Sequence, residues 1–174
     1  MRVEKMADNI ISNMAPLDNE LRGAMYSRDF AKARGLIEKG ADPNTRNGWG
    51  SPFICWCAEN GKTDLIDFAL EKGADIDATN KNGETALHKA AQLGRVEMID
   101  FLIDRGANIN YRNIHDTTPL SVAALFDQPE AAKKLLCSGA DPSILNHKGV
   151  SAAQIAEEKG NDAVVALFSK DGRF

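Results

Sequence analysis

Three pairs of residues have types and spacings that suit metal binding or nucleophilic catalysis: Cys55 with Cys57, Cys55 with His88, and His115 with His147. A Cys-x-Cys pair can hold a soft metal ion or cycle through a disulfide, and a thiol beside an imidazole can act as a nucleophile. On a helix, however, residues two positions apart point about 200° away from each other, so Cys55 and Cys57 cannot share one metal ion. We expect both cysteines to be small buried residues.

Motifs for phosphate chemistry are missing from the chain. It has neither a GxxxxGK[ST] loop nor a GxGxxG sequence, and Gly48-Trp49-Gly50 is expected in a hairpin instead of a strand-to-helix turn. The histidine pair lacks a third carboxylate or thiol ligand, which makes a metal site a weak hypothesis. With no convergent nucleophile, base and pocket, we expect no enzyme, no cofactor and no bound metal.

Length and composition are those of an ordinary globular domain. The chain has 174 residues, of which 43% are hydrophobic, and a formal net charge of −4. This balance argues against nucleic acid and anionic membranes as partners, and no apolar run is long enough to span a bilayer. Acidic residues interrupt the first 20 residues, so a secretory signal is not expected there. We therefore expect a cytoplasmic protein whose three cysteines are free thiols.

An internal repeat organises nearly the whole sequence. The tripeptide Gly-Ala-Asp or Gly-Ala-Asn begins at Gly40, Gly73, Gly106 and Gly139, each 33 residues after the one before. Other columns keep the same step, among them Asn47, Asn80, Asn113 and Asn146. Agreement of several columns in one register excludes coincidence.

Each unit predicts two short helices and one hairpin. In the clearest copy Thr85 is placed to cap a helix, Ala90 and Ala91 leave room for a neighbouring helix, and Gly94 ends the helix. A second segment has apolar residues at helical spacing, namely Val96, Met98, Ile99, Leu102 and Ile103. The polar run 107–115 that follows is typical of a hairpin projecting away from the helices.

The unit length and the pattern Thr-Pro-Leu-His-x-Ala-Ala-x-x-Gly followed by Gly-Ala-Asp resemble the ankyrin repeat. The resemblance implies an all-α solenoid of about five helix-turn-helix units with projecting hairpin loops. We expect an ankyrin-repeat domain over residues 17–174, with copies at 17–49, 50–82, 83–115, 116–148 and a shortened 149–174. Residues 1–16 form a separate segment, expected to be a capping helix, with a partner-binding or disordered arm as the alternatives.

The same resemblance implies that His88 is structural and bonds toward the adjacent hairpin, and we expect Trp56 to pack between repeats. Two departures from the family pattern affect the expected helix start and turns. Ser51-Pro52 stands one residue earlier than Thr118-Pro119, which predicts an earlier start for that helix. Asp127 and Arg28 replace the usual turn glycine, which puts the turns between the paired helices in doubt.

In the ankyrin family the variable surface comprises the hairpin tips and the C-terminal ends of the first helices, which form a concave face. By this resemblance we expect a protein–protein interaction module, acting as an adaptor, an inhibitor or an immunity-type protein. The alternative is a self-assembling scaffold, in which the same face or the N-terminal segment joins copies of the chain. The expected contact residues are Arg46, Trp49, Asn60, Lys81, Asn82, Leu93, Arg112, Ile114, His115, Leu125, Phe126, Leu145, His147 and Lys148.

Two properties of this expected face point to the partner. Large apolar side chains at solvent-facing positions usually mark an interface, and aromatic residues are enriched among those that dominate binding. The fingertips also carry basic residues, whereas the second helices are rich in Asp and Glu. We therefore expect a partner protein with an acidic patch, and a chain that is monomeric when alone.

Overall fold

The structure is a computed structural model that describes residues 16–168. Its described part contains ten helices and no strand, with one isolated bridge between Arg46 and Pro52. The predicted capping helix of residues 1–16 lies almost wholly outside the described residues. The helices are α2 Pro16–Ser27, α3 Phe30–Glu38, α4 Phe53–Glu59, α5 Thr63–Glu71, α6 Ala86–Gln92, α7 Val96–Asp104, α8 Pro119–Leu125, α9 Pro129–Cys137, α10 Ala152–Lys159 and α11 Asp162–Phe168.

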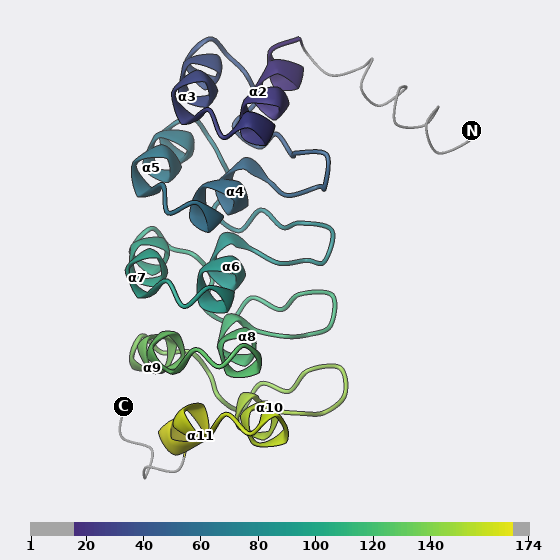
Figure 1. The fold of residues 1–174 in the computed structure, drawn as a ribbon, viewed down its shortest axis with the longest axis vertical. Coiled ribbons are helices and arrows are strands. Elements are labelled where there is room, and N and C mark those ends of the chain that lie inside the picture. The colour runs from purple at the N-terminus through teal and green to yellow at the C-terminus, as the bar shows by residue number, and fades with distance from the viewer. Residues whose placement is uncertain (1–15, 169–174) are drawn as a thin grey trace, which may run out of the picture.

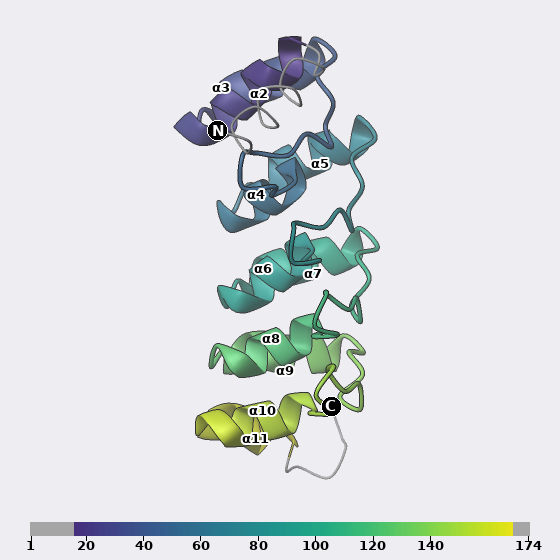
Figure 2. The same cartoon turned by 90° about the vertical axis from the view of Figure 1, so that its right-hand side faces the viewer.

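These helices pair into repeats that stack in two columns (Figure 1). The first helices α2, α4, α6, α8 and α10 form the inner column, and the second helices α3, α5, α7, α9 and α11 form the outer column. Loops project from the inner column as a row of fingers, and Figure 2 views the stack from that side. The all-α solenoid predicted from the repeat is confirmed.

Small residues allow the first helices to approach closely. One repeat column contains Ala24, Cys57, Ala90, Ala123 and Ala156, and none of these side chains is more than 1% exposed. A side chain of one or two heavy atoms at this position lets the neighbouring helix pack at close range without a void. Cys57 fills the same role as the alanines, which explains why it is buried and unpaired.

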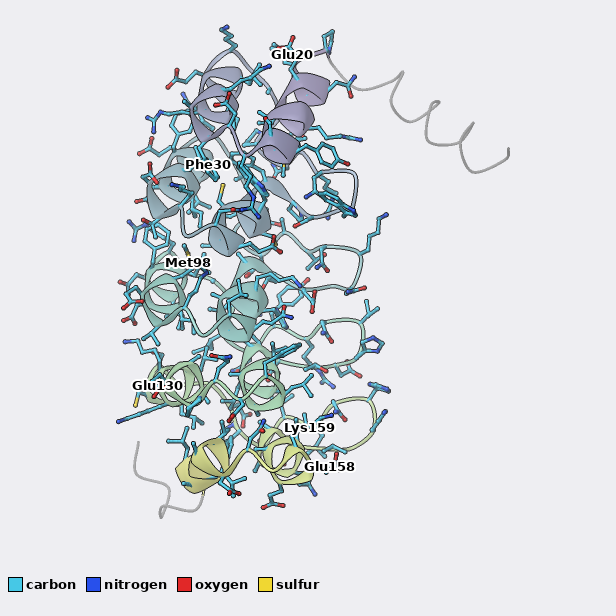
Figure 3. The ribbon with its side chains drawn as sticks, in the orientation of Figure 1. Glu20, Phe30, Met98, Glu130, Glu158 and Lys159 are labelled. Atoms are coloured by element: carbon cyan, nitrogen blue, oxygen red, sulfur yellow. The ribbon has the colours of Figure 1, made fainter. Side chains whose placement is uncertain are left out.

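The outer helices are amphipathic. Met98, Ile99 and Leu102 of α7 are buried against the neighbouring helices, as their helical spacing predicts. Figure 3 shows Met98 and Glu130 on the outer column, and Glu130 belongs to the exposed face of α9. Each repeat therefore buries one face of both helices and leaves the hairpin side and the outermost face free.

The helix of the second copy does not start early, so that prediction was wrong. α4 begins at Phe53, in the same repeat column as Ala86 of α6. Pro52 stands at the N-cap in an extended conformation, with φ −60° and ψ 154°. A residue that precedes proline is disfavoured in the helical region, so Ser51 cannot extend the helix backwards.

The turns between paired helices form even where glycine is missing. Arg28 and Asp127 adopt positive φ angles of 54° and 52°, close to the 69° and 64° of Gly61 and Gly94 in the same column. A left-handed conformation costs a residue with a side chain roughly 1 kcal/mol, and packing of the two helices outweighs that cost. The structure thus settles the doubt that these substitutions raised.

A column of asparagines shapes the fingertips. The side-chain oxygen of Asn113 accepts hydrogen bonds from the backbone N–H groups of His115 and Thr117, at 2.9 and 3.0 Å. Asn47, Asn80 and Asn146 make the same pair of bonds in their own hairpins. Each asparagine satisfies two donors that no strand partner reaches, which explains why this residue recurs at the repeat step.

The buried thiols are expected to be inert in the folded protein. Burial raises the pKa of Cys55 to about 12 and that of Cys57 well above its usual range, whereas Cys137 is exposed. Because the thiolate is the reactive form, titration with a thiol reagent should modify Cys137 quickly and the other two only after denaturation. Fast reaction of all three native thiols would contradict the burial of Cys55 and Cys57.

Candidate functional site

The Cys55–His88 pair does not form a catalytic dyad. His88 Nδ1 lies 2.9 Å from the Thr85 hydroxyl, and His88 Nε2 lies 3.0 Å from the backbone oxygen of Thr117. Cys55 Sγ lies 3.5 Å from a different acceptor, the backbone oxygen of Ala78. Both ring nitrogens of His88 are therefore occupied, and the predicted bond toward the adjacent hairpin is confirmed. The imidazole ties α6 to the next finger.

Stability should fall in mild acid because of His88. Burial lowers the pKa of this imidazole, partly offset by its bond to Thr117 and the nearby Glu84 carboxylate. The unfolded chain then binds a proton near pH 6.5 while the folded chain does not, so stability is complete above pH 6.5 and declines as the pH falls toward the lower native pKa. Denaturant titrations between pH 7.5 and 5 should show this slope, and His88→Asn should be less stable but flatter across the window.

The two fingertip histidines meet without forming a metal site. The ring centroids of His115 and His147 are 5.2 Å apart, and His147 Nδ1 lies 2.9 Å from the backbone oxygen of His115. Over residues 16–168 no group of three or more His, Cys, Asp or Glu side chains is placed to hold a metal ion. These histidines therefore link neighbouring hairpins at an exposed edge.

Large apolar side chains are exposed along the hairpin and first-helix side. All six that the repeat columns placed in solvent are exposed there: Trp49 70%, Ile114 62%, Leu93 48%, Phe126 46%, Leu145 46% and Leu125 39%. Trp49, Ile114 and Leu145 belong to hairpins, whereas Leu93, Leu125 and Phe126 lie at the ends of α6 and α8. Trp56, by contrast, is 5% exposed and stacks on Phe30, as predicted for a residue packed between repeats.

A pocket of about 320 Å³ lies where the first two repeats meet the first hairpin. Its lining includes Tyr26, Trp49 and Trp56, together with Glu59 and Asn60 at the end of α4. The rings of Tyr26 and Trp49 meet edge to face, with centroids 4.9 Å apart. Asn60 donates its amide to the backbone oxygen of Trp56 at 2.7 Å, which fixes one wall.

A model of three tandem ankyrin repeats matches residues 21–113 and again residues 54–146. The chain belongs to the ankyrin repeat family. A search of curated proteins found no individual relative. Ankyrin repeats generally mediate protein–protein interaction, and their helix pairs and fingers are those described above. Across residues 16–168 no helix is long and apolar enough to cross a membrane.

Two of the predicted fingertip charges of this ankyrin domain hold the fingers together. Arg46 donates to the backbone oxygen of Thr79, and Arg112 donates to that of Leu145 at 3.3 Å, in the same columns of successive hairpins. Arg112 also pairs with Asp116 at 3.3 Å. Their charges still face solvent, but their loss would disturb the hairpins as well as any partner contact.

The remaining predicted polar positions lie at the edge of the ankyrin fingers. Lys81, Asn82 and Lys148 are exposed hairpin residues, and the backbone oxygen of Asn82 accepts a hydrogen bond from the N–H of Ile114 at 3.1 Å. Lys81 lies across Gly50 of the preceding hairpin, where an added Cβ would come within 2.6 Å of its side chain. The side chain of Lys81, which belongs to the basic edge, therefore packs on the preceding hairpin.

The outer helices are less acidic than their Asp and Glu content predicts. Asp67 pairs with Arg105 at 2.8 Å, and Asp100 pairs with Lys134, so both acids bridge successive outer helices. Such half-exposed pairs contribute little to stability, but they neutralise part of the charge. The contrast between a basic finger edge and an acidic outer face is weaker than composition suggests.

Tyr26 is the surface residue that sequence reasoning missed. It is 50% exposed, it contacts Trp49, and it stands one repeat before Glu59 and three repeats before Leu125 in the same column. The signal was present, because the position 33 residues before Glu59 belongs to the same variable surface. The divergence of the first ankyrin copy hid this correspondence.

Proposed function

We propose that this chain binds a partner protein through the hairpin tips and the C-terminal ends of the first helices. The observation that carries the proposal is the exposure of six large apolar side chains on that one side. Single exposed apolar residues are common on soluble proteins, but a set that includes two aromatics on one side is typical of an interface. The partner would cover Trp49 at one end of this face and Phe126 at the other.

The positive charges on the fingers support the proposal that the partner has an acidic patch. Arg46, Lys81, Arg112 and Lys148 are exposed, one on each of the four successive fingers. Rim charges of this kind mainly steer the encounter and raise the association rate. The role that follows is that of an adaptor or of an inhibitor that blocks the partner's surface, including an immunity-type protein.

Lys81→Ala should lower the association rate constant severalfold at low salt, with little change in the dissociation rate. In the described part of the chain, Lys81 Nζ makes no ion pair, so the substitution removes a charge without leaving a buried acid unpaired. Stopped-flow or surface resonance at several salt concentrations measures both rates. If the salt dependence of the association rate were the same as in the wild type, Lys81 would not steer the encounter.

Partner capture with matched baits tests the proposal directly. Wild-type chain and a Trp49→Ala/Phe126→Ala double variant are used to capture proteins from the native host, and bound proteins are identified by mass spectrometry. We expect at least one protein that the wild type retains and the double variant loses. Recovery of the same proteins by both baits would place the interface elsewhere.

Light scattering across a concentration series tests the alternative of self-assembly. A constant mass equal to that of one chain supports a monomer that binds a different protein. A mass that rises with concentration and reverts in the double variant would instead identify this face as a contact between copies.

A further inference from the structure

The pocket between the first two repeats combines aromatic walls with an unpaired carboxylate. Tyr26, Trp49 and Trp56 contribute rings to it, and Glu59 lines the same volume of about 320 Å³. In the described part of the chain the Glu59 carboxylate makes no ion pair and no hydrogen bond. Lys89, a nearby cation, pairs with Glu84 at 2.6 Å instead. Glu59 therefore has a half-buried negative charge that no described side chain neutralises by direct contact.

The electrostatics of the pocket favour a cation. Aromatic rings attract cations through their negative faces, and the attraction grows when water is excluded. Burial raises the pKa of Glu59, an effect that Lys89 opposes and Glu84 reinforces. A cation that entered the pocket would offset this burial cost and favour the ionised carboxylate.

Arg28 is the one feature of the lining that opposes a cation. It lies at the turn after α2 with a positive φ of 54°, and its residue is exposed, so water screens its charge more than that of Glu59. The aromatic rings and the less exposed carboxylate act in the opposite direction, with Tyr26 on α2, Trp56 and Glu59 on α4, and Trp49 on the hairpin. The two charges of the lining are opposite, so the three aromatic rings and the more screened position of Arg28 are what favour a cation.

We propose that this pocket receives a single cationic side chain of the protein partner, a lysine or an arginine. The alkyl stem would lie against Trp49 and Tyr26 while the charged group reaches Glu59 and the side-chain amide oxygen of Asn60. The inference rests on the proposed function and deepens it: the partner presents an acidic patch to the finger edge and one basic anchor to this pocket.

Small side-chain analogues test the pocket on the full chain without a known partner. The probes are n-butylammonium for lysine, n-butanol as the neutral match and butyrate as the anionic match. The readout is the indole N–H signal of Trp49 in a ¹⁵N correlation spectrum, assigned with the Trp49→Phe variant. We expect saturable shifts with n-butylammonium, and binding of n-butanol and butyrate weaker by about fivefold or more.

Two charge variants determine which residue carries the selectivity. Glu59→Gln keeps the shape of the side chain and should weaken n-butylammonium about fivefold while leaving n-butanol unchanged. Arg28→Gly restores the glycine found at Gly61, Gly94 and Gly160 of the same column, so the turn tolerates it. It should tighten n-butylammonium about twofold to threefold by removing a like charge. Thermal denaturation confirms that both variants are folded.

Three results would overturn the inference: no saturable shift with n-butylammonium, equal binding of n-butanol, or preference for butyrate with loss of binding in Arg28→Gly. The first means that no cation binds here, the second indicates an apolar anchor, and the third indicates an acidic one. Each leaves the proposed function intact if the Trp49→Ala/Phe126→Ala bait still loses its partner. If instead n-butylammonium binds as expected but both baits recover the same proteins, the proposed function fails and the cation pocket stands.

Discussion

Replacing Trp49 or Phe126 by alanine is expected to weaken partner binding by about 2 kcal/mol or more, roughly a thirtyfold rise in Kd. Both side chains are large, aromatic and exposed, at 70% and 46%, so a partner that covers them would remove much apolar surface from water. Buried aromatic anchors at interfaces typically dominate the binding free energy. Calorimetry or surface resonance with the captured partner measures the change.

These two substitutions should change the stability of the folded protein very little. Trp49 contacts Tyr26 edge to face, an interaction that is worth about 1 kcal/mol at most at such an exposed site. Phe126 is the C-cap of α8. Its backbone N–H donates to the oxygen of Val122, and its side chain is exposed. Denaturant midpoints close to that of the wild type would show that lost binding comes from lost contact and not from unfolding.

Glu71→Ala and Asp104→Ala provide matched controls on the outer column. The two residues occupy one repeat column at the ends of α5 and α7, both are exposed, and within residues 16–168 neither forms an ion pair. They are better controls than Asp67 or Asp100, which bridge neighbouring repeats. If these changes abolished binding while Trp49→Ala and Phe126→Ala bound normally, the partner would lie on the outer face.

Ala90→Leu should destabilise the fold by about 1–3 kcal/mol. Ala90 is fully buried on α6, which packs between α4 and α8, and its column neighbours Cys57 and Ala123 are fully buried as well. A leucine there adds three carbon atoms where the neighbouring helices already fill the space, so helices must shift or adopt strained rotamers. Urea unfolding followed by circular dichroism measures the loss.

Ala153→Leu on the last inner helix is the matched control for overpacking. Ala153 of α10 is partly exposed, and no further inner helix follows it within the described residues. We expect a change smaller than about 0.5 kcal/mol there, in keeping with a surface substitution. Equal stability of Ala90→Leu and wild type would mean that the helices are packed in a different register.

The repeat made most of the architecture predictable. A 33-residue step fixes which residues share a column, and side chains in a column have the same surroundings in every interior copy. For this reason the helix pairs, the buried small residues and the buried Trp56 followed from spacing and residue type. The finger contact of His88 and the exposure of the six apolar side chains followed from the resemblance to the ankyrin family. Arg28 and Asp127 even adopt the left-handed backbone conformation of the glycines in their column, although they are not glycines.

Contacts between different columns were not predictable in the same way. The Asp67–Arg105 and Asp100–Lys134 pairs join residues whose separations in sequence differ from the repeat step. The start of α4 depended on how Pro52 is placed against the cap position, and not on the proline alone. Such details depend on the reach and rotamer of long side chains, which the spacing of residues does not specify.

The sequence by itself determined the family, the solenoid and the core columns, because neighbouring repeats impose one environment on each column. Only the tertiary structure brought Tyr26, Trp49, Trp56 and Glu59 around one pocket and left the Glu59 carboxylate without an ion-pair partner among residues 16–168. These four residues come from two helices and a hairpin in different columns. Whether these residues come together depends on how α2, α4 and the first finger pack in space. The spacing of residues along the sequence does not specify this packing.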